Sequence, residues 1–510
     1  MSETLETLRR TYHPPIPSLL QDLARVSLST TNPTSSLGDA EQLKKLFPLT
    51  FGRPVLSAHL GHERTRQPLT LGVLFSGGQA SGGHNVIAGI FDALTPKSRL
   101  LGFLNGPSGL ISGAQKELTR EALAPYRNQG GFDLLGSGRT KIETPEQFLS
   151  CLKVCQDLKL DGLVIIGGDD SNTNAALLAE FFLAKKCPTR VVGVPKTIDG
   201  DLQHPQLPIS FGFDTACKVY SEMIGNIAKD ALSAKKYYHF IKVMGRSASH
   251  IALECALSTR PNLTLIGEEK KGLADVVKEI AGLITARAHV GKNYGVILIP
   301  EGLIEFIPEI AQLMKELNHT SDAKALTPPS RRIFSLFPEN IQKQLLLERD
   351  PHGNVQVSLI ETERMLIELV RKEIAGPFGS VSHFLGYEGR AGFPSNFDAA
   401  YCTALGMTSV LLIEAGHSGY MCAIPNLKAP AFEWTPHGLP LTMLMDLEQR
   451  AGKQKPVVQK TLVDLKGKPF LKFAKMRNTW KLEDHYCCPG PIQFFGPEEL
   501  INSIPHILVD

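Results

Sequence analysis

The sequence carries little net charge and lacks long apolar runs. Its 54 Lys and Arg residues nearly balance 51 Asp and Glu residues, which leaves a net charge of +3. So small a charge does not indicate a nucleic acid or a membrane surface as the partner. No apolar run approaches the ~18 residues that a membrane helix needs, and the first ten residues, MSETLETLRR, lack the apolar segment of a secretory signal. We therefore expect a soluble, cytoplasmic protein.

The nine cysteines show no regular spacing. They include no CxxC and no Cys/His pattern typical of a zinc site, and the close pairs are Cys151 with Cys155 and Cys487 with Cys488. We expect free thiols in a reducing compartment rather than a disulfide framework. The hydrophobic fraction of 43% is enough for a large core and excludes wholesale disorder. At roughly 150 residues per domain, the 510 residues predict about three domains, or two large ones.

Short apolar runs recur from about residue 70, each followed by a loop and a helical stretch. They are LTLGVLF, DGLVII, RVVGVP, FIKVM, LTLIG and YGVILIP. Buried runs of this length that alternate with helices indicate parallel strands with βα crossovers. We expect an α/β fold of two doubly wound, Rossmann-like lobes, with ligands bound where the strands end.

Changes in residue composition along the chain give approximate boundaries for its parts. Residues 303–385 are rich in charged helical pieces and predict a helical insertion, while residues 1–68 are broken by YHPPIP and STTNPTSSLG and predict an irregular arm. The remaining parts are a first lobe over residues 69–230, a second lobe over 231–302 and 386–425, and a C-terminal segment over 426–510 that packs on the lobes.

Two loops of the first lobe carry glycines and acids. Residues 76–83 hold four glycines in eight positions before a helix, an arrangement that binds phosphate but equally makes a tight turn. This loop matches neither GxxxxGK[ST] nor GxGxxG. Asp169 and Asp170 follow another strand and precede a helix. Each could be a simple helix cap, but beside a phosphate loop one of them is well suited to hold Mg²⁺.

Later loops add cations and further acids. Lys196, Asp199 and Asp201 lie within six residues; a Lys can neutralise a transferring phosphoryl group and an Asp can accept a hydroxyl proton, although a polar surface turn has the same composition. Arg246 and Arg390 could each bind a phosphate monoester, and Glu301 could accept hydrogen bonds from hydroxyl groups.

Together these stretches resemble a known family. The SGG loop, GGDD, PKTIDGD, MGR, IPEG and GYEGR occur in this order and closely resemble the phosphofructokinases, in particular the pyrophosphate-dependent enzymes of the long, plant-like type. The resemblance runs from about residue 70 to about 420. It implies the phosphofructokinase fold, and reversible phosphorylation of fructose 6-phosphate at its 1-hydroxyl by pyrophosphate and Mg²⁺ in glycolysis or gluconeogenesis.

The resemblance also implies roles for individual residues. Asp169 would hold Mg²⁺, Asp199 would be the proton acceptor with Asp201 beside it, and Lys196 and Asp170 would set donor specificity and stabilise the transition state. Pyrophosphate would contact Gly78 and Arg139. Fructose 6-phosphate would contact Thr197, Ile198, Asp199, Met244, Gly245, Arg246, Glu301, Tyr387, Glu388, Gly389 and Arg390.

One stretch points to assembly. Lys236 and Tyr237 of AKKYYHF occupy the part of the chain that in the family reaches the sugar site of a neighbouring subunit, and Lys235 is an alternative contact. The resemblance therefore implies a homo-oligomer of at least two subunits.

Asp170 bears on the choice of donor. ATP-using relatives have glycine there, and a carboxylate would lie where the α-phosphate of a nucleotide binds. At about 4 Å two such charges repel by about 4 kcal/mol at an effective dielectric near 20. An ATP-dependent phosphofructokinase and a regulatory subunit of a phosphofructokinase complex remain the alternatives. The intact GGDD, TIDGD and MGR stretches argue against a purely regulatory chain, and an NAD or lipid kinase gives no reason for MGR or GYEGR.

Overall fold

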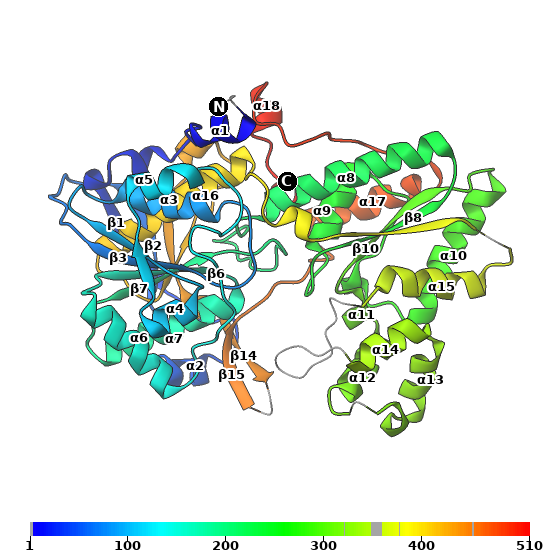
Figure 1. Ribbon diagram of the computed structural model, residues 1–510, viewed down its shortest axis with the longest axis horizontal. Helices are drawn as coiled ribbons and strands as arrows, with labels where there is room; N and C mark the ends of the chain where they lie inside the picture. The colour runs from blue at the N-terminus through cyan, green and yellow to red at the C-terminus, as the bar shows by residue number, and fades with distance from the viewer. Residues whose placement is uncertain (1–3, 321, 348–359, 377, 451–452, 510) are drawn as a thin grey trace. The chain divides into compact units, whose positions relative to one another are not determined.

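The computed structural model describes residues 4–320, 322–347, 360–376, 378–450 and 453–509 of the chain. The chain forms two compact units (Figure 1). Unit 1 comprises Met1–Ala216, Arg390–Lys460 and Gln493–Ile504; unit 2 comprises Cys217–Gly389, Thr461–Ile492 and Pro505–Asp510. Each unit has its own sheet and its own helices, so the expected two α/β lobes are confirmed.

Unit 1 is built on a nine-stranded sheet of order β1-β2-β13-β12-β7-β6-β3-β4-β5. Its centre, from β12 to β4, is parallel, and antiparallel strands flank it on both sides. The strands are β1 (Val26–Pro33), β2 (Pro54–Leu60), β3 (Thr70–Phe75), β4 (Arg99–Phe103), β5 (Gln115–Glu117), β6 (Gly162–Gly167), β7 (Arg190–Pro195), β12 (Tyr420–Ala423) and β13 (His437–Pro440).

The central strands are apolar beyond their first residues, as expected for strands that helices cover on both faces of the sheet (Figure 1). Every residue of β6, for example, is buried. The helices of this unit are α1 (Leu5–Arg10), α2 (Ala40–Leu46), α3 (Gly83–Ala93), α4 (Pro107–Ser112), α5 (Arg120–Leu123), α6 (Pro145–Asp157), α7 (Asp169–Ala184), α16 (Asn396–Glu414) and α18 (Glu498–Ile501).

Helix α16 is the core helix of unit 1. A Cβ on Gly406 would lie 2.1 Å from the carbonyl oxygen of Val86, and a Cβ on Gly89 would lie 2.2 Å from that of Thr403, so the backbones of α3 and α16 touch. Within the described residues α16 is also the one helix long and apolar enough to cross a membrane, with a mean hydropathy of 1.2. That length was not expected from the sequence. Its 18-residue apolar window is wholly buried, as in a core helix.

A two-stranded hairpin extends from unit 1. It is formed by β14 (Met445–Arg450) and β15 (Lys453–Val458), which pair antiparallel. The hairpin packs beside α2 and α7 (Figure 1). Val458 is buried in the core, and its N–H donates to Oγ1 of Thr173 in α7 at 2.9 Å. The C-terminal segment is thereby fixed against the helix that begins with Asp169.

Unit 2 is built on a four-stranded parallel sheet of order β11-β8-β10-β9. Its strands are β8 (Tyr238–Val243), β9 (Leu263–Thr264), β10 (Gly295–Pro300) and β11 (Ser380–Leu385). Its helices are α8 (Phe213–Ala234), α9 (His250–Thr259), α10 (Leu273–His289), α11 (Leu303–Phe306), α12 (Pro308–Leu317), α13 (Pro328–Leu336), α14 (Glu339–Leu347), α15 (Thr362–Glu373) and α17 (Lys468–Leu482). The expected helical insertion corresponds to α11 to α15, whose apolar side chains join the core of this unit.

The structure divides the chain differently from the expected boundaries. The N-terminal arm supplies β1 and β2 to the large sheet, and residues 380–385, expected in the insertion, form β11. Residues 390–425, expected in the second lobe, belong to unit 1 because α16 packs on α3 and β7. Residues 426–510 are shared between the two units.

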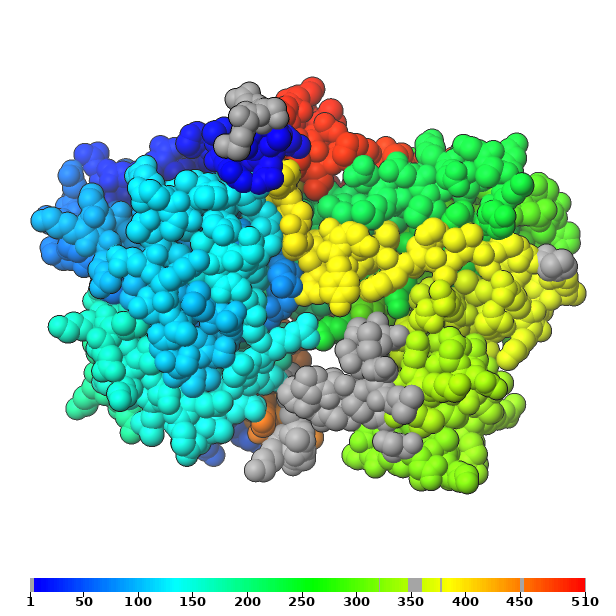
Figure 2. All heavy atoms as spheres, in the orientation of Figure 1, coloured from blue at the N-terminus to red at the C-terminus, as the bar shows by residue number. Residues whose placement is uncertain are grey.

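The first and last parts of unit 1 lie side by side. Figure 2 shows the N-terminal residues in blue against C-terminal residues in red. The guanidinium of Arg9 lies 4.4 Å from the ring centroid of Phe494 and donates to Oδ1 of Asn396 at 2.8 Å. The arm is therefore anchored at the start of α16.

Candidate active site

The glycine loop of unit 1 follows β3. Gly77 has a φ of +85°, and its N–H donates to the carbonyl of Gly138 at 2.9 Å. A Cβ on Gly77 would lie 3.3 Å from Nζ of Lys196, and a Cβ on Gly78 would lie 2.1 Å from a guanidinium nitrogen of Arg390. Two cations therefore face consecutive glycines, and any side chain at Gly78 would displace Arg390. This arrangement suits a polyanion held against the loop.

Arg139 lies beside the same loop. It follows Gly138, which bridges Ser76, and its side chain is exposed. The structure thus brings Gly78, Arg139, Lys196 and Arg390 into one region of unit 1.

The two adjacent acids lie in the first turn of α7, after β6. The N-cap residue of this helix is Gly168, so neither acid occupies the N-cap position. Oδ2 of Asp170 lies 3.4 Å from Nζ of Lys141, and the Asp170 side chain is 46% exposed. Lys141 was not expected from the sequence. Its ammonium partly compensates the negative charge of Asp170, which was expected to repel the α-phosphate of a nucleotide.

Lys196 begins the loop after β7 and is almost completely buried. Its N–H donates to the carbonyl of Gly167 at 2.9 Å, which joins this loop to the start of α7. Burial, and to a smaller extent Arg390, lower the pKa of Lys196 to about 8 against the opposing effect of Asp199. An ammonium with a lowered pKa and little access to water gains the most when an anion binds beside it.

The rest of this loop orients two acids. Asp199 is half-buried and its N–H donates to Oγ1 of Thr197 at 3.1 Å, while the side chain of Ile198 is buried. Asp201 is buried; its pKa is raised by desolvation first and then by the neighbouring charge of Asp199.

A lysine from the hairpin segment reaches the acids. Nζ of Lys460 lies 3.6 Å from Oδ2 of Asp169 and 3.7 Å from Oδ2 of Asp201. It lowers the pKa of Asp201, in opposition to the desolvation. Sequence reasoning missed Lys460 because nothing in the Lys-rich C-terminal segment marks one lysine among the others.

Oxygen ligands for a divalent metal are present at this point. Asp169 and Asp201 converge on one cation, Nζ of Lys460, so two carboxylates already face a common position. In the described part of the chain no group of three or more His, Cys, Asp or Glu side chains could hold a metal alone. Mg²⁺ needs few protein ligands and completes its shell with water and substrate phosphate, so the pair fits this ion.

The expected sugar-site residues of unit 2 lie at one edge of its sheet. Val243 pairs in register with both Pro300 and Leu385, so β8, β10 and β11 end side by side. The residues that follow these strands are Met244–Arg246, Glu301 and Gly386–Gly389.

Glu301 holds two of these loops together. It is buried, and its Oε2 accepts from the N–H of Gly245 at 3.1 Å. Gly245 has a φ of +137°, a conformation that L side chains rarely adopt. Arg246 beside it is exposed, and its carbonyl lies against Gly302.

The third loop combines exposed and constrained residues. Tyr387 is 73% exposed. Oε2 of Glu388 accepts from the N–H of Gly386 at 2.7 Å. A Cβ on Gly389 would meet the ring of Tyr220 at 2.5 Å, so this position requires glycine.

Lys236 and Tyr237 lie at the other end of β8, at the α8–β8 turn. Both are exposed, and Tyr237 has a φ of +58°. The six residues of β8 span about 20 Å, which separates this turn from Met244–Arg246. Within one chain these two residues are not brought to the sugar-site edge.

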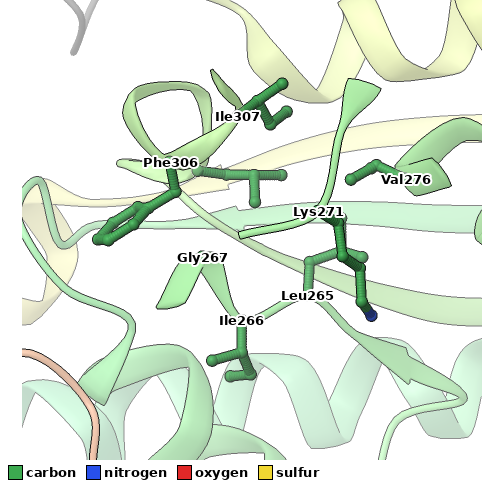
Figure 3. Close-up of a pocket in the computed structure, with 8 residues that line it drawn as sticks. Leu265, Ile266, Gly267, Lys271, Val276, Phe306 and Ile307 are labelled. Carbon is green, nitrogen blue, oxygen red and sulfur yellow. The ribbon is translucent and has the colours of Figure 1, made fainter. Parts of the chain in front are cut away.

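The enclosed cavity shown in Figure 3 is a packing defect of unit 2. Its volume is about 10 Å³, room for roughly one water molecule, and its lining includes Leu265, Val276, Phe306 and Ile307. It contains none of the expected site residues.

Comparisons with known proteins identify the family of this chain. Residues 70–413 match the family model described as phosphofructokinase. Over 98% of its length the chain is 49% identical to a pyrophosphate--fructose 6-phosphate 1-phosphotransferase of Porphyromonas gingivalis, covering 97% of that protein. It is 53% identical to the beta subunit of the enzyme of that name from Solanum tuberosum, over 98% of this chain and 92% of the relative.

Solved structures support the fold. A pyrophosphate-dependent phosphofructokinase from Nitrosospira multiformis aligns with a TM-score of 0.56 over 76% of this chain and 86% of that one, at 17% identity. The family match covers more than half of the chain, and the relatives are similar over nearly their whole length. The chain therefore belongs to the phosphofructokinase family.

Proposed function

We propose that the protein transfers a phosphoryl group from pyrophosphate to the 1-hydroxyl of fructose 6-phosphate, forming fructose 1,6-bisphosphate and phosphate, reversibly and in the cytoplasm. A place in glycolysis or gluconeogenesis follows from these substrates. The observation that carries the proposal is the pair of acids at the start of α7 beside a glycine loop that two cations face. The near-full-length similarity to proteins named for this reaction supports it.

The donor side uses residues of unit 1. Arg390, expected at the sugar phosphate, is proposed here for the donor side, because its guanidinium faces Gly78. Lys196 and Arg390 then bind pyrophosphate oxygens against Gly77 and Gly78. Their charge stabilises the phosphoryl group as its bond to the leaving phosphate lengthens. The Asp170 carboxylate repels the α-phosphate of a nucleoside triphosphate. Pyrophosphate has no third phosphate and avoids this repulsion.

The acceptor is activated by Asp199. As the sugar oxygen attacks phosphorus, its proton passes to the Asp199 carboxylate and the bridging oxygen leaves with the bond electrons as phosphate. Asp201 lies beside Asp199 and faces the same position as Asp169. A magnesium ion bound by Asp169 would supply neutralisation of the phosphate oxygens.

Unit 2 supplies groups for the sugar phosphate. Arg246 presents a guanidinium for the 6-phosphate, and Glu301 fixes the backbone from which Arg246 extends. Lys236 and Tyr237, at the far end of β8, serve the sugar site of a neighbouring subunit, so the active form is a homo-oligomer of at least two chains.

One coupled assay on the purified protein tests the proposal. Fructose 6-phosphate and Mg²⁺ are supplied with pyrophosphate or with ATP, and formation of fructose 1,6-bisphosphate is followed. We expect turnover with pyrophosphate only. Turnover with ATP alone would make the chain an ATP-dependent enzyme, and turnover that needs a second protein would make it a regulatory subunit.

A further inference from the structure

The segment that carries Lys460 is held rigidly against the site of unit 1. The N–H of Val458 donates to Oγ1 of Thr173, and that hydroxyl donates to the carbonyl of Asp169 at 2.9 Å. The N–H of Gln459 donates to the carbonyl of Leu444 at 2.8 Å. Lys460 comes next in the chain, directly after a segment that is held one helical turn from Asp169.

The ammonium of Lys460 lies between two carboxylates without closing a short ion pair with either. Its separations of 3.6 and 3.7 Å from Asp169 and Asp201 exceed the 2.7–2.9 Å typical of a charge-assisted hydrogen bond. The side chain is 32% exposed.

The charge balance of the site calls for such a group. Asp169, Asp170, Asp199 and Asp201 are gathered near a position proposed for a polyanion, and Coulomb repulsion between anions a few ångströms apart amounts to several kcal/mol. Lys196 and Arg390 face the glycine loop. Lys460 is the cation on the side of Asp169 and Asp201.

We infer that Lys460 is a pyrophosphate-binding residue, contributed to the site by the C-terminal segment. The inference rests on the proposed function. The ammonium binds phosphate oxygen on the side of the donor that faces Asp169 and Asp201. Lys196 and Arg390 bind the side that faces the glycines, so the donor is held by cations from three separate segments.

Two substitutions of Lys460 and one matched control test the inference. Lys460→Met removes the charge and keeps the length of the side chain, and Lys460→Arg keeps the charge. Lys455→Met is the control, because Lys455 lies on β15, shortly before Lys460 in the chain, and pairs with Glu143 at 3.2 Å. Pyrophosphate binding is measured by calorimetry with and without Mg²⁺, together with the KM of each substrate and the thermal midpoint.

We expect Lys460→Met to weaken pyrophosphate binding at least tenfold, also without Mg²⁺, and to leave the KM for fructose 6-phosphate within threefold. Lys460→Arg should retain most of the affinity and Lys455→Met all of it. Native-like pyrophosphate affinity in Lys460→Met would overturn the inference. The inference would also be overturned if Lys460→Met bound Mg²⁺ more tightly and pyrophosphate no more weakly, because Lys460 would then be a counter-ion only. An equal loss of affinity for both substrates, with a lower thermal midpoint in both Lys460 variants, would overturn it as well, because the role of Lys460 would then be structural.

The proposed function and this inference can fail separately. If the native protein binds no pyrophosphate and shows no turnover with it, the proposed function fails first. If the native protein binds pyrophosphate and Lys460→Met binds it equally well, only the role of Lys460 is lost.

Discussion

Replacing Asp170 tests the proposal that its charge excludes ATP from this site. Two unit charges about 4 Å apart repel by about 4 kcal/mol at an effective dielectric near 20 and by about 1 kcal/mol in water. The Asp170 side chain is 46% exposed and lies 3.4 Å from Nζ of Lys141, so its effect belongs in the lower part of this range. We expect Asp170→Asn to strengthen ATP binding by about 1 to 2 kcal/mol, roughly 5- to 30-fold.

The assay is inhibition of the pyrophosphate reaction by ATP, with calorimetry of ATP binding beside it. Asp170→Asn keeps the shape of the side chain, and Asp170→Gly removes it, so the two variants separate charge from bulk. Asp157→Asn, on the exposed face of α6, is the control. An unchanged inhibition constant for ATP in both Asp170 variants would refute the electrostatic account.

Replacing Lys141 tests the role of the Asp170 charge independently. Because its ammonium compensates Asp170, Lys141→Met should weaken ATP binding further, about two- to fivefold. The effect should vanish when Lys141→Met is combined with Asp170→Asn. If the two substitutions act additively, Lys141 affects ATP by another route.

Three further predictions concern the loop, the buried lysine and the packing of unit 2. Gly78→Ala forces Arg390 aside, and we expect tenfold weaker pyrophosphate binding by calorimetry with the thermal midpoint lowered by at most about 2 °C. Since Lys196 is protonated only below its pKa of about 8, the affinity for pyrophosphate should fall as the pH rises past that value, and Lys196→Arg should remove this dependence in a pH titration. Glu363→Gln leaves the buried ammonium of Lys242, 3.3 Å away, without its carboxylate, and we expect a loss of about 3 to 5 kcal/mol in urea unfolding; a loss below ~1 kcal/mol would contradict it.

Local pattern predicted the central strands correctly. LTLGVLF, DGLVII and RVVGVP form β3, β6 and β7, and the runs in unit 2 form β8, β9 and β10. Strands covered on both faces are apolar throughout, and such runs are visible in the sequence itself. The glycines and charged residues that follow them are therefore also found, as Gly78, Asp169 and Lys196 illustrate.

What the sequence did not reveal depends on pairing between distant segments. β1 has mostly exposed or half-buried side chains and resembles a loop, yet it pairs with β2 from Val26 to Pro33. The membership of α16 in unit 1 follows from its contact with α3, about three hundred residues earlier. Lys460 reaches the acids only because Val458 docks on Thr173. Contacts of this kind join segments that are far apart in the sequence, so a local pattern of apolar residues does not predict them.

The order of strands in the large sheet has a consequence for synthesis of the chain. β12 and β13 lie between β2 and β7, although the ribosome makes them more than two hundred residues after β7. Until residue 440 has emerged, the first two strands have no neighbour that joins them to the rest of the sheet. The apolar face on which α16 packs stays uncovered until residue 414 has been made. The nascent chain therefore exposes apolar surface until these segments are made. We expect C-terminally truncated forms to aggregate and the yield of soluble protein to depend on the amount of chaperone present.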